Sequence, residues 1–141
     1  MKYIYYFFTL FTGVIILSAC DNKQPSIGQN LAHHRFTVIE LNNEKIINSK
    51  QTFIEFGENS TVNGQMCNQF FGQANITKNR IEIPHLASTN RLCSDEQLNK
   101  LDLIMSQLLQ YGAIANLNQE LGELTLKNDE YELKFRQKDL M

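Results

Sequence analysis

The chain has 141 residues, of which 20% are charged, and its formal net charge is −2 at pH 7. This length suits one domain with a hydrophobic core of its own. Acidic and basic side chains are interspersed along the chain, so no basic stripe is available to follow a phosphate backbone. We therefore expect one folded domain and no nucleic-acid partner.

The N-terminal segment has the parts of a secretory signal. Lys2 provides a basic start, an apolar run extends from Tyr3 to Leu17, and two small residues precede Cys20. This pattern is typical of a bacterial lipoprotein processing site, where cleavage leaves the cysteine as a lipidated N-terminus. We expect a signal peptide over residues 1–19 and acyl chains, including palmitate, on Cys20. The mature chain would then be held to a membrane and face an oxidising compartment.

Two other interpretations of this segment stay open. One is a signal anchor that remains in the bilayer, although a spanning helix needs roughly 20 apolar residues and this run is shorter. The other is an ordinary cleaved signal with Cys20 as a structural thiol. The cysteine count favours lipidation, because lipidation of Cys20 leaves Cys67 and Cys93 as an even pair.

Residues 20–33 are rich in Asn, Gln, Ser, Gly and Pro, a composition that predicts a flexible tether between lipid and domain. Asp21 directly follows the cysteine that we expect to be lipidated. In many Gram-negative bacteria, an aspartate at this position retains a lipoprotein at the inner membrane. We therefore expect the protein at the periplasmic face of the inner membrane, with the outer membrane as the alternative.

Short runs of alternating polar and apolar residues follow and predict a domain over residues 34–137. We expect strands over residues 36–41, 45–47, 52–56, 61–64, 73–77 and 80–84. Asn42 and Asn43 supply a tight turn after the first strand. Pro84 ends the last of them, because proline cannot donate a hydrogen bond to a neighbouring strand.

One helix is predicted over about 95–109. Ser94 and Gln97 have the spacing of a capping box. The apolar stripe that follows consists of Leu98, Leu101, Met105 and Leu108. Further strands are expected over residues 113–117, 123–127 and 131–135, the last two as a hairpin. Strands on both sides of a single helix indicate an α+β fold, in which a small curved antiparallel or barrel-like sheet packs on that helix.

A composite motif runs through the middle of this region. It consists of Gly64, Cys67-Asn68, Phe70 and Gly72, then Ser88-Thr89, Cys93 and the helix that follows Ser94. In this order the motif resembles the META-domain family, which includes the heat-inducible HslJ-type lipoproteins, and the resemblance covers residues 34–136. It implies a link to envelope stress, antibiotic tolerance or virulence, and it implies no established molecular activity.

Cys67 and Cys93 have two interpretations. A redox pair would be favoured by close Cys-x-x-Cys spacing, which this pair lacks. A structural disulfide is favoured by the oxidising compartment. Closing a loop of about 26 residues would stabilise the folded state by roughly 3.5 kcal/mol. We expect the disulfide.

Other chemistry-bearing residues form no recognisable site. His33 and His34 are neighbours, which point to opposite faces in a strand, and His85 has no ligand-spaced partner, so a metal ligand set is incomplete. Ser88 and Ser94 lack the Gly-x-Ser-x-Gly context of a serine nucleophile. We therefore expect no metal, no cofactor and no enzymatic activity.

Asn68 is the polar residue of greatest interest, because its neighbours are expected to be buried. Its amide either satisfies the backbone of a turn or lines a small cleft with Phe70 and Thr89. Gly72 and Ser88 join these residues as candidates for binding or for turn structure. Turn structure is the favoured role.

These observations together predict a lipid-anchored envelope protein that acts as a non-enzymatic binding or stress-response factor, with an envelope protein as its partner. Two alternatives stay open. One is a small-ligand-binding protein or enzyme with a cleft near Asn68 and Thr89, which requires a concave pocket with convergent polar groups. The other is a subunit of an envelope assembly or secretion complex, for which an exposed apolar patch would be the sign.

Overall fold

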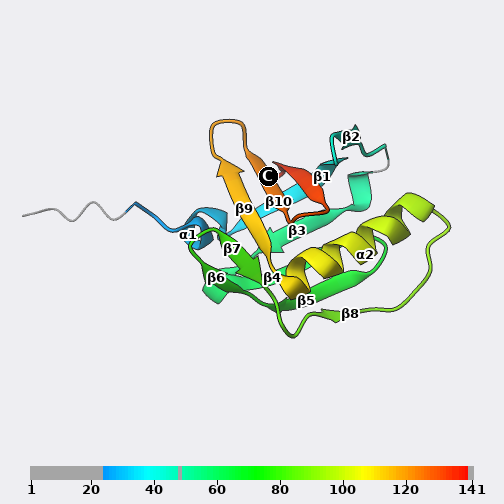
Figure 1. Ribbon diagram of the computed structural model, residues 1–141, viewed down its shortest axis with the longest axis horizontal. Coiled ribbons are helices and arrows are strands. Elements are labelled where there is room, and N and C mark those ends of the chain that lie inside the picture. Colours follow the sequence, from blue (N-terminus) through cyan, green and yellow to red (C-terminus); the bar gives the residue numbers. More distant parts are fainter. Residues whose placement is uncertain (1–23, 48, 140–141) are drawn as a thin grey trace, which may run out of the picture.

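The computed structural model describes residues 24–47 and 49–139 and shows a curved antiparallel sheet with a long helix beside it (Figure 1). The strands are β1 (His34–Leu41), β2 (Glu44–Lys45), β3 (Phe53–Phe56), β4 (Thr61–Gln65), β5 (Gln69–Gln73), β6 (Asn75–Thr77), β7 (Arg80–Glu82), β8 (Ala87–Ser88), β9 (Ala113–Asn118), β10 (Glu123–Lys127) and β11 (Glu132–Gln137). The α-helices are α1 (Ile27–Leu31) and α2 (Glu96–Tyr111), and short 3-10 helices cover Ser49–Gln51 and Glu58–Ser60. The expected α+β class is confirmed.

The sheet curls because one bent hairpin contributes to both of its ends. The strand order is β6-β7-β9-β10-β11-β1-β3-β4-β5-β8, with β2 attached to β1. β5 and β6 are separated by Ala74 alone, and β7 and β8 return alongside them. The pairing shifts by one residue between Phe70↔Ser88 and Asn75↔Glu82, which marks a bulge where the hairpin bends. β4 pairs with one half of this hairpin and β9 with the other, so the sheet approaches a closed barrel.

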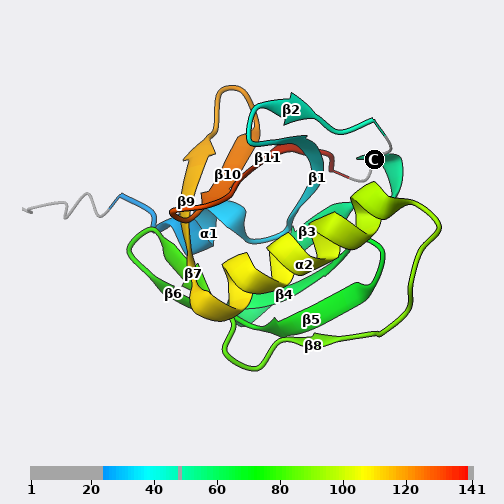
Figure 2. The ribbon, with the colours of Figure 1, turned by 45° about the vertical axis from the view of Figure 1, so that its right-hand side comes forward.

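Helix α2 runs between β1 on one side and β4 and β5 on the other, as Figure 2 shows. Its buried residues are Leu98, Leu101, Ile104, Met105, Leu108 and Leu109, which include the whole predicted stripe. The start of the helix differs from the prediction, because Asp95 and not Ser94 is the N-cap and Asp95 Oδ1 accepts a hydrogen bond from Gln97 N at 2.9 Å. Both residue types cap helices well, so two of them in succession leave the first turn ambiguous in the sequence.

One hydrophobic cluster fills the curled sheet and includes the buried face of α2. Phe36 and Phe56 pack edge to face, with ring centroids 6.1 Å apart. Phe135 of β11 is fully buried in the same cluster. The sheet and the helix therefore share a single core, and neither can bury its apolar face without the other.

The prediction of a flexible tether over residues 20–33 is wrong at its C-terminal end, because this part forms α1. Ser26 and Gln29 make a capping box. The Gln29 N–H donates to Ser26 Oγ at 3.4 Å, and the Ser26 N–H donates to Gln29 Oε1 at 2.9 Å. Leu31 is fully buried in the core. The folded domain therefore begins before the predicted boundary at His34.

The sequence pattern also misses β5 and β8. In β5 the side chains do alternate between core and solvent, but Phe70 is buried while Phe71 beside it is 63% exposed. Two apolar residues in succession hide the period-two signal. The strand expected over residues 73–77 is divided at Ala74, where the hairpin bends. β8 has two residues, too few for a pattern to appear.

Replacing Leu31 by alanine should lower the free energy of unfolding by about 3 kcal/mol, because the change leaves a cavity in the core. Urea unfolding of the two proteins measures the difference. The matched control is Leu121→Ala, since Leu121 is 63% exposed, and it should change the free energy by less than about 0.5 kcal/mol. If both substitutions changed the free energy of unfolding equally, α1 would not be part of the folded domain.

Candidate functional site

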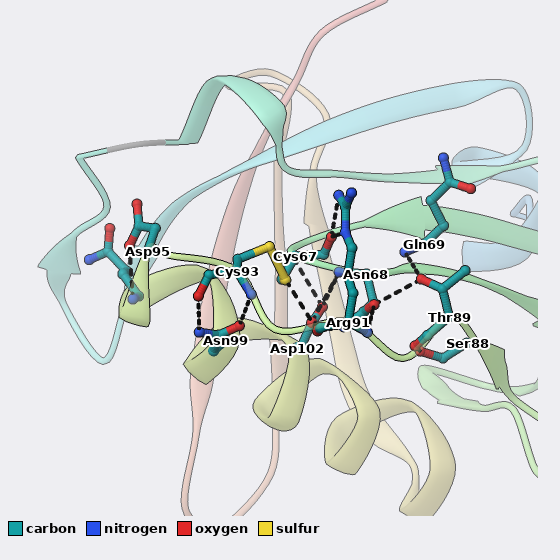
Figure 3. Close-up of a disulfide and its surroundings, with 11 residues drawn as sticks. Cys67, Asn68, Gln69, Ser88, Thr89, Arg91, Cys93, Asp95, Asn99 and Asp102 are labelled. Carbon is teal, nitrogen blue, oxygen red and sulfur yellow. Dashed lines mark hydrogen bonds between the residues drawn. A yellow bond between two sulfur atoms is a disulfide. The ribbon is translucent and has the colours of Figure 1, made fainter.

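The residues singled out in the sequence meet where the turn between β4 and β5, the segment between β8 and α2, and α2 itself come together (Figure 3). Asn68 lies at the centre of this junction and is partly buried. Its Nδ2 donates to the carbonyl oxygen of Arg91 at 2.9 Å and to Asp102 Oδ2 at 2.7 Å. Its Oδ1 accepts hydrogen bonds from Thr89 Oγ1 at 2.9 Å and from Arg91 N at 2.8 Å. These four bonds use the full capacity of an asparagine amide.

Asp102 fixes α2 to the turn between β4 and β5. Its Oδ1 accepts from Cys67 N at 3.1 Å and from Asn68 N at 3.0 Å. Its Oδ2 accepts hydrogen bonds from the backbone N of Asn68 at 3.0 Å and from the side-chain Nδ2 of Asn68. Hydrogen bonds to an ionised acceptor are stronger than neutral ones, so this carboxylate is the strongest polar link between helix and sheet at the junction.

The segment that leads into α2 is held by side chains, because it lies beyond β8 and has no strand partner of its own. The Arg91 guanidinium donates to the Cys67 carbonyl oxygen, from Nη2 at 2.9 Å and from Nε at 3.2 Å. Asn99 of α2 binds Cys93 at both backbone groups: Cys93 N donates to Asn99 Oδ1 at 3.0 Å, and Asn99 Nδ2 donates to Cys93 O at 2.8 Å.

The expected disulfide is present between Cys67 and Cys93, with an S–S distance of 2.07 Å and Cα atoms 5.9 Å apart. It joins the turn after β4 to the residue that Asn99 holds on α2. Cys67 is fully buried, whereas Cys93 is partly exposed. The covalent bond therefore crosses the same junction as the hydrogen bonds of Asn68 and Asp102.

The remaining site candidates have structural surroundings. Phe70 is 5% exposed and belongs to the core. A Cβ atom at Gly72 would lie 2.4 Å from Ile83 Cγ2, so a larger residue cannot fit there without movement. Thr89 Oγ1 accepts from Gln69 N at 3.1 Å, and Ser88 Oγ donates to the Thr89 carbonyl oxygen at 2.8 Å.

The geometry gives Asn68 the turn-structural role and leaves its amide no free donor or acceptor for a ligand. Sequence reasoning did not find Arg91, Asn99 or Asp102. A signal for the last two was present, because they lie three residues apart on one face of a helix. Asn and Asp are also weak helix formers, so two of them inside α2 indicate a tertiary role.

An open pocket of about 800 Å³ lies beside this junction, where Ile47, Lys50 and Gln51 face the start of α2. Its lining consists of Ile47, Lys50, Gln51, Arg91, Leu92, Cys93, Ser94, Asp95 and Leu98. Ile47 is 87% exposed and Leu92 is 88% exposed, so two apolar side chains project at its rim. Neither Asn68 nor Thr89 lines this pocket.

His34 is bonded to residues near the C-terminal end of the described chain. His34 Nδ1 is 3.1 Å from Asp139 Oδ1. Hydrogen bonds from Gln137 and then from His34 lower the pKa of Asp139, and a hydrogen bond to Glu40 raises the pKa of Lys134. Among residues 24–47 and 49–139, no group of three His, Cys, Asp or Glu side chains could hold a metal ion.

Cys20 lies outside the described residues, so the structure does not bear on its lipidation. Within the part of the chain that the structure describes, no helix combines the length and apolarity needed to cross a bilayer.

Comparisons with known proteins agree with the fold. A model of the META domain matches residues 29–140. Heat shock protein HslJ of Escherichia coli (strain K12) is 31% identical to this chain over 130 residues, which cover 90% of the chain and 91% of that protein.

Solved structures give the same result. An NMR structure at 32% sequence identity superposes with a TM-score of 0.70 and covers 77% of this chain and 92% of that one. An NMR structure of a protein from Burkholderia xenovorans has a TM-score of 0.62 at 11% identity, over 79% of this chain and 86% of that one. At that identity the second comparison shows a shared fold alone.

Replacing Asn68 by alanine should lower the free energy of unfolding by about 3 kcal/mol, because several hydrogen bonds are lost and partly buried groups are left unpaired. Chemical denaturation followed by circular dichroism measures this loss. Asn63→Ala is the matched control, since Asn63 is an exposed residue of β4 and should be nearly neutral. A neutral Asn68→Ala would show that the amide network adds nothing to folding.

Replacing both Cys67 and Cys93 by serine should lower the free energy of unfolding by roughly 3.5 kcal/mol, because the unfolded chain regains the entropy of the closed loop. Denaturation of the oxidised protein, the reduced protein and the double variant separates this effect from side-chain loss. A reductant should not affect the double variant. Equal midpoints for oxidised and reduced protein would contradict a stabilising disulfide.

Proposed function

The chain belongs to the META-domain family, and on this premise we propose that it is a lipid-anchored protein of a bacterial cell envelope with a non-enzymatic binding role under stress. The similarity to a heat shock protein over most of both chains supports the association with stress.

The arrangement of the three cysteines carries the proposal. Cys67 and Cys93 are joined to each other, which leaves Cys20 as the third cysteine of the sequence. Cys20 closes an apolar run behind a basic start, which is the context of lipoprotein processing. A disulfide is also a bond of oxidising compartments, and the envelope is one. The two observations support the same location independently.

The place where the chain enters the domain supports a function at a membrane. Residue 24 precedes α1, at one end of the molecule in both ribbon views, and the start of α2 with its pocket lies toward the other end (Figures 1 and 2). Residues 20–24 can span at most about 18 Å when fully extended. An anchor at Cys20 would therefore keep the α1 end near the bilayer and direct the pocket into the periplasm.

A binding role is supported by the use that the fold makes of its polar residues. Asn68, Arg91 and Asp102 are brought together as catalytic groups often are, but they bond to one another and to the backbone. A general acid or base needs a substrate within hydrogen-bond reach, and these groups already have their partners. The pocket beside them offers both apolar and charged side chains to solvent, among them Ile47, Leu92 and Lys50.

The exposed pair at the rim also favours a second candidate, which is a subunit of a larger envelope assembly or secretion complex. Single exposed apolar residues are common on soluble proteins, but neighbouring ones that border a pocket are typical of interaction sites. This candidate differs from an independent accessory factor in requiring a permanent partner.

Replacing Cys20 by serine should move the protein from the membrane fraction to the soluble fraction of the envelope, because the acceptor of the lipid is lost. Cell fractionation with immunoblotting measures the location, and incorporation of an alkyne-labelled palmitate analogue measures the lipid. We expect the unaltered protein in the inner-membrane fraction of a density gradient, on the basis of Asp21.

Cys93→Ser is the control for the loss of a thiol at another position, and it should leave both membrane association and labelling unchanged. Wild-type and Cys20→Ser proteins that are both membrane-bound and both without label would support the signal anchor instead. Equal labelling of the wild-type and Cys20→Ser proteins would rule out Cys20 as the lipid acceptor. A soluble wild-type protein without label would contradict the proposal.

A further inference from the structure

The two sulfur-bearing residues of the disulfide differ in their access to solvent. Cys67 belongs to the turn between β4 and β5 and is fully buried. Cys93 is partly exposed and lines the open pocket at the start of α2. A reagent in solution can therefore approach the bond from the Cys93 side only, without any opening of the core.

The surroundings of Cys93 suit a protein reagent better than a small one. Ile47 and Leu92, 87% and 88% exposed, stand at the rim of the same pocket. Burial of two such exposed apolar side chains against another protein surface would be energetically favourable. The pocket, at about 800 Å³, leaves room for a projecting loop that carries a reactive side chain.

The charges around the pocket favour an anionic reagent. Lys50 and Arg91 both line it, against the single carboxylate of Asp95. A thiolate, which is the attacking form of a cysteine, would be drawn toward this net positive charge. At Cys67 the Arg91 guanidinium, 2.9 Å from the carbonyl oxygen, is balanced by the Asp102 carboxylate, 3.1 Å from the backbone nitrogen, so the attraction acts at the pocket lining.

From these three features we propose that Cys93 is a thiol–disulfide exchange site, through which a dithiol oxidoreductase of the envelope reduces and re-forms the disulfide. The oxidoreductase contacts the rim at Ile47 and Leu92 and presents its cysteine to Cys93 within the pocket. The identity of the partner class rests on the proposed envelope location, whereas the reactivity of Cys93 does not.

The exchange proceeds in two balanced steps. The thiolate of the first cysteine of the oxidoreductase attacks Cys93 Sγ, an intermolecular S–S bond forms, and the bond to Cys67 breaks. Cys67 leaves as a thiolate and takes up a proton. The second cysteine of the oxidoreductase then attacks its own first sulfur, and Cys93 leaves and is protonated. The oxidoreductase ends as a disulfide, and the chain has gained two electrons and two protons.

The reduced chain keeps its fold at the junction because the hydrogen bonds there do not depend on the disulfide. Asn99 still binds both backbone groups of Cys93, and Asp102 still accepts from the turn at Cys67 and Asn68. Reduction would thus weaken the junction and expose a thiol in the pocket without unfolding the domain. The site can for this reason cycle between two folded states.

The test uses the full-length protein, extracted from membranes in mild detergent, and a thioredoxin-type oxidoreductase whose second active-site cysteine is replaced by alanine. This probe stops at the mixed disulfide. Trypsin would place Cys93 in the peptide over residues 92–100 and Cys67 in the peptide over residues 51–78. Mass spectrometry should find about ten times more probe on the peptide over residues 92–100 than on the peptide over residues 51–78, because Cys93 is the more accessible cysteine.

Variants of the rim separate docking from simple exposure. Ile47→Ser with Leu92→Ser should slow the reaction with the probe about tenfold, and reduction by dithiothreitol should keep its rate. Leu103→Ser with Leu121→Ser is the matched control, because both residues are more than half exposed and neither lines the pocket. This control should change neither rate.

The proposal is overturned if the probe attaches to residues 51–78, or if no mixed disulfide forms until a denaturant unfolds the domain. The proposal is also overturned if Ile47→Ser with Leu92→Ser slows the probe and dithiothreitol equally. The two residues would then affect the disulfide through the stability of the domain and not through docking. The experiment is performed on purified protein, so its failure leaves the lipid anchor standing. Failure of the Cys20 experiment likewise leaves the reactivity of Cys93 untouched.

Discussion

The contact between Asp102 and the turn at Cys67 and Asn68 is the interaction on which the arrangement of this molecule depends. Here two backbone N–H groups of the turn between β4 and β5 donate hydrogen bonds to a carboxylate of the helix. Asn68, positioned by it, holds the backbone of Arg91. That segment in turn carries Cys93 to the start of α2, where the disulfide forms. The pocket exists because the segment is held in this path and not packed into the core.

The sequence predicts those parts of the fold whose signals are local. The strands that became β1, β3, β10 and β11 have a clear alternation, and the stripe on α2 has a clear helical period, so all were found near their observed bounds. The elements that were missed depend on distant partners. β5 carries adjacent phenylalanines, and only its place between β4 and β8 decides which one is buried. α1 lies in a polar stretch, and its burial comes from one residue, Leu31.

The site shows the same division. The motif around Cys67 and Asn68 could be identified because its residues are of unusual types at fixed spacing, and the even cysteine count pointed to the bond that the structure contains. Asn99 and Asp102 inside a helix were a signal of a tertiary role, but the turn that Asp102 binds could not be identified, because that contact joins residues distant in the sequence. The pocket could not be predicted either, since Ile47, Lys50 and Gln51 meet residues 91–95 only in the folded chain.

Residues of the family motif therefore serve the fold, some at the junction and some in the core, whereas the exposed apolar residues at the pocket lie outside the motif. Asn68 and Gly72 have no room for change, because one has all its hydrogen bonds filled and the other has Ile83 against its Cα. Ile47 and Leu92 contact almost nothing in the domain, so folding does not require their apolar character. Exposed apolar side chains that border one pocket, as these two do, are typical of an interaction site. Function in this chain is therefore to be sought at the end where α2 begins, away from the end where the chain enters.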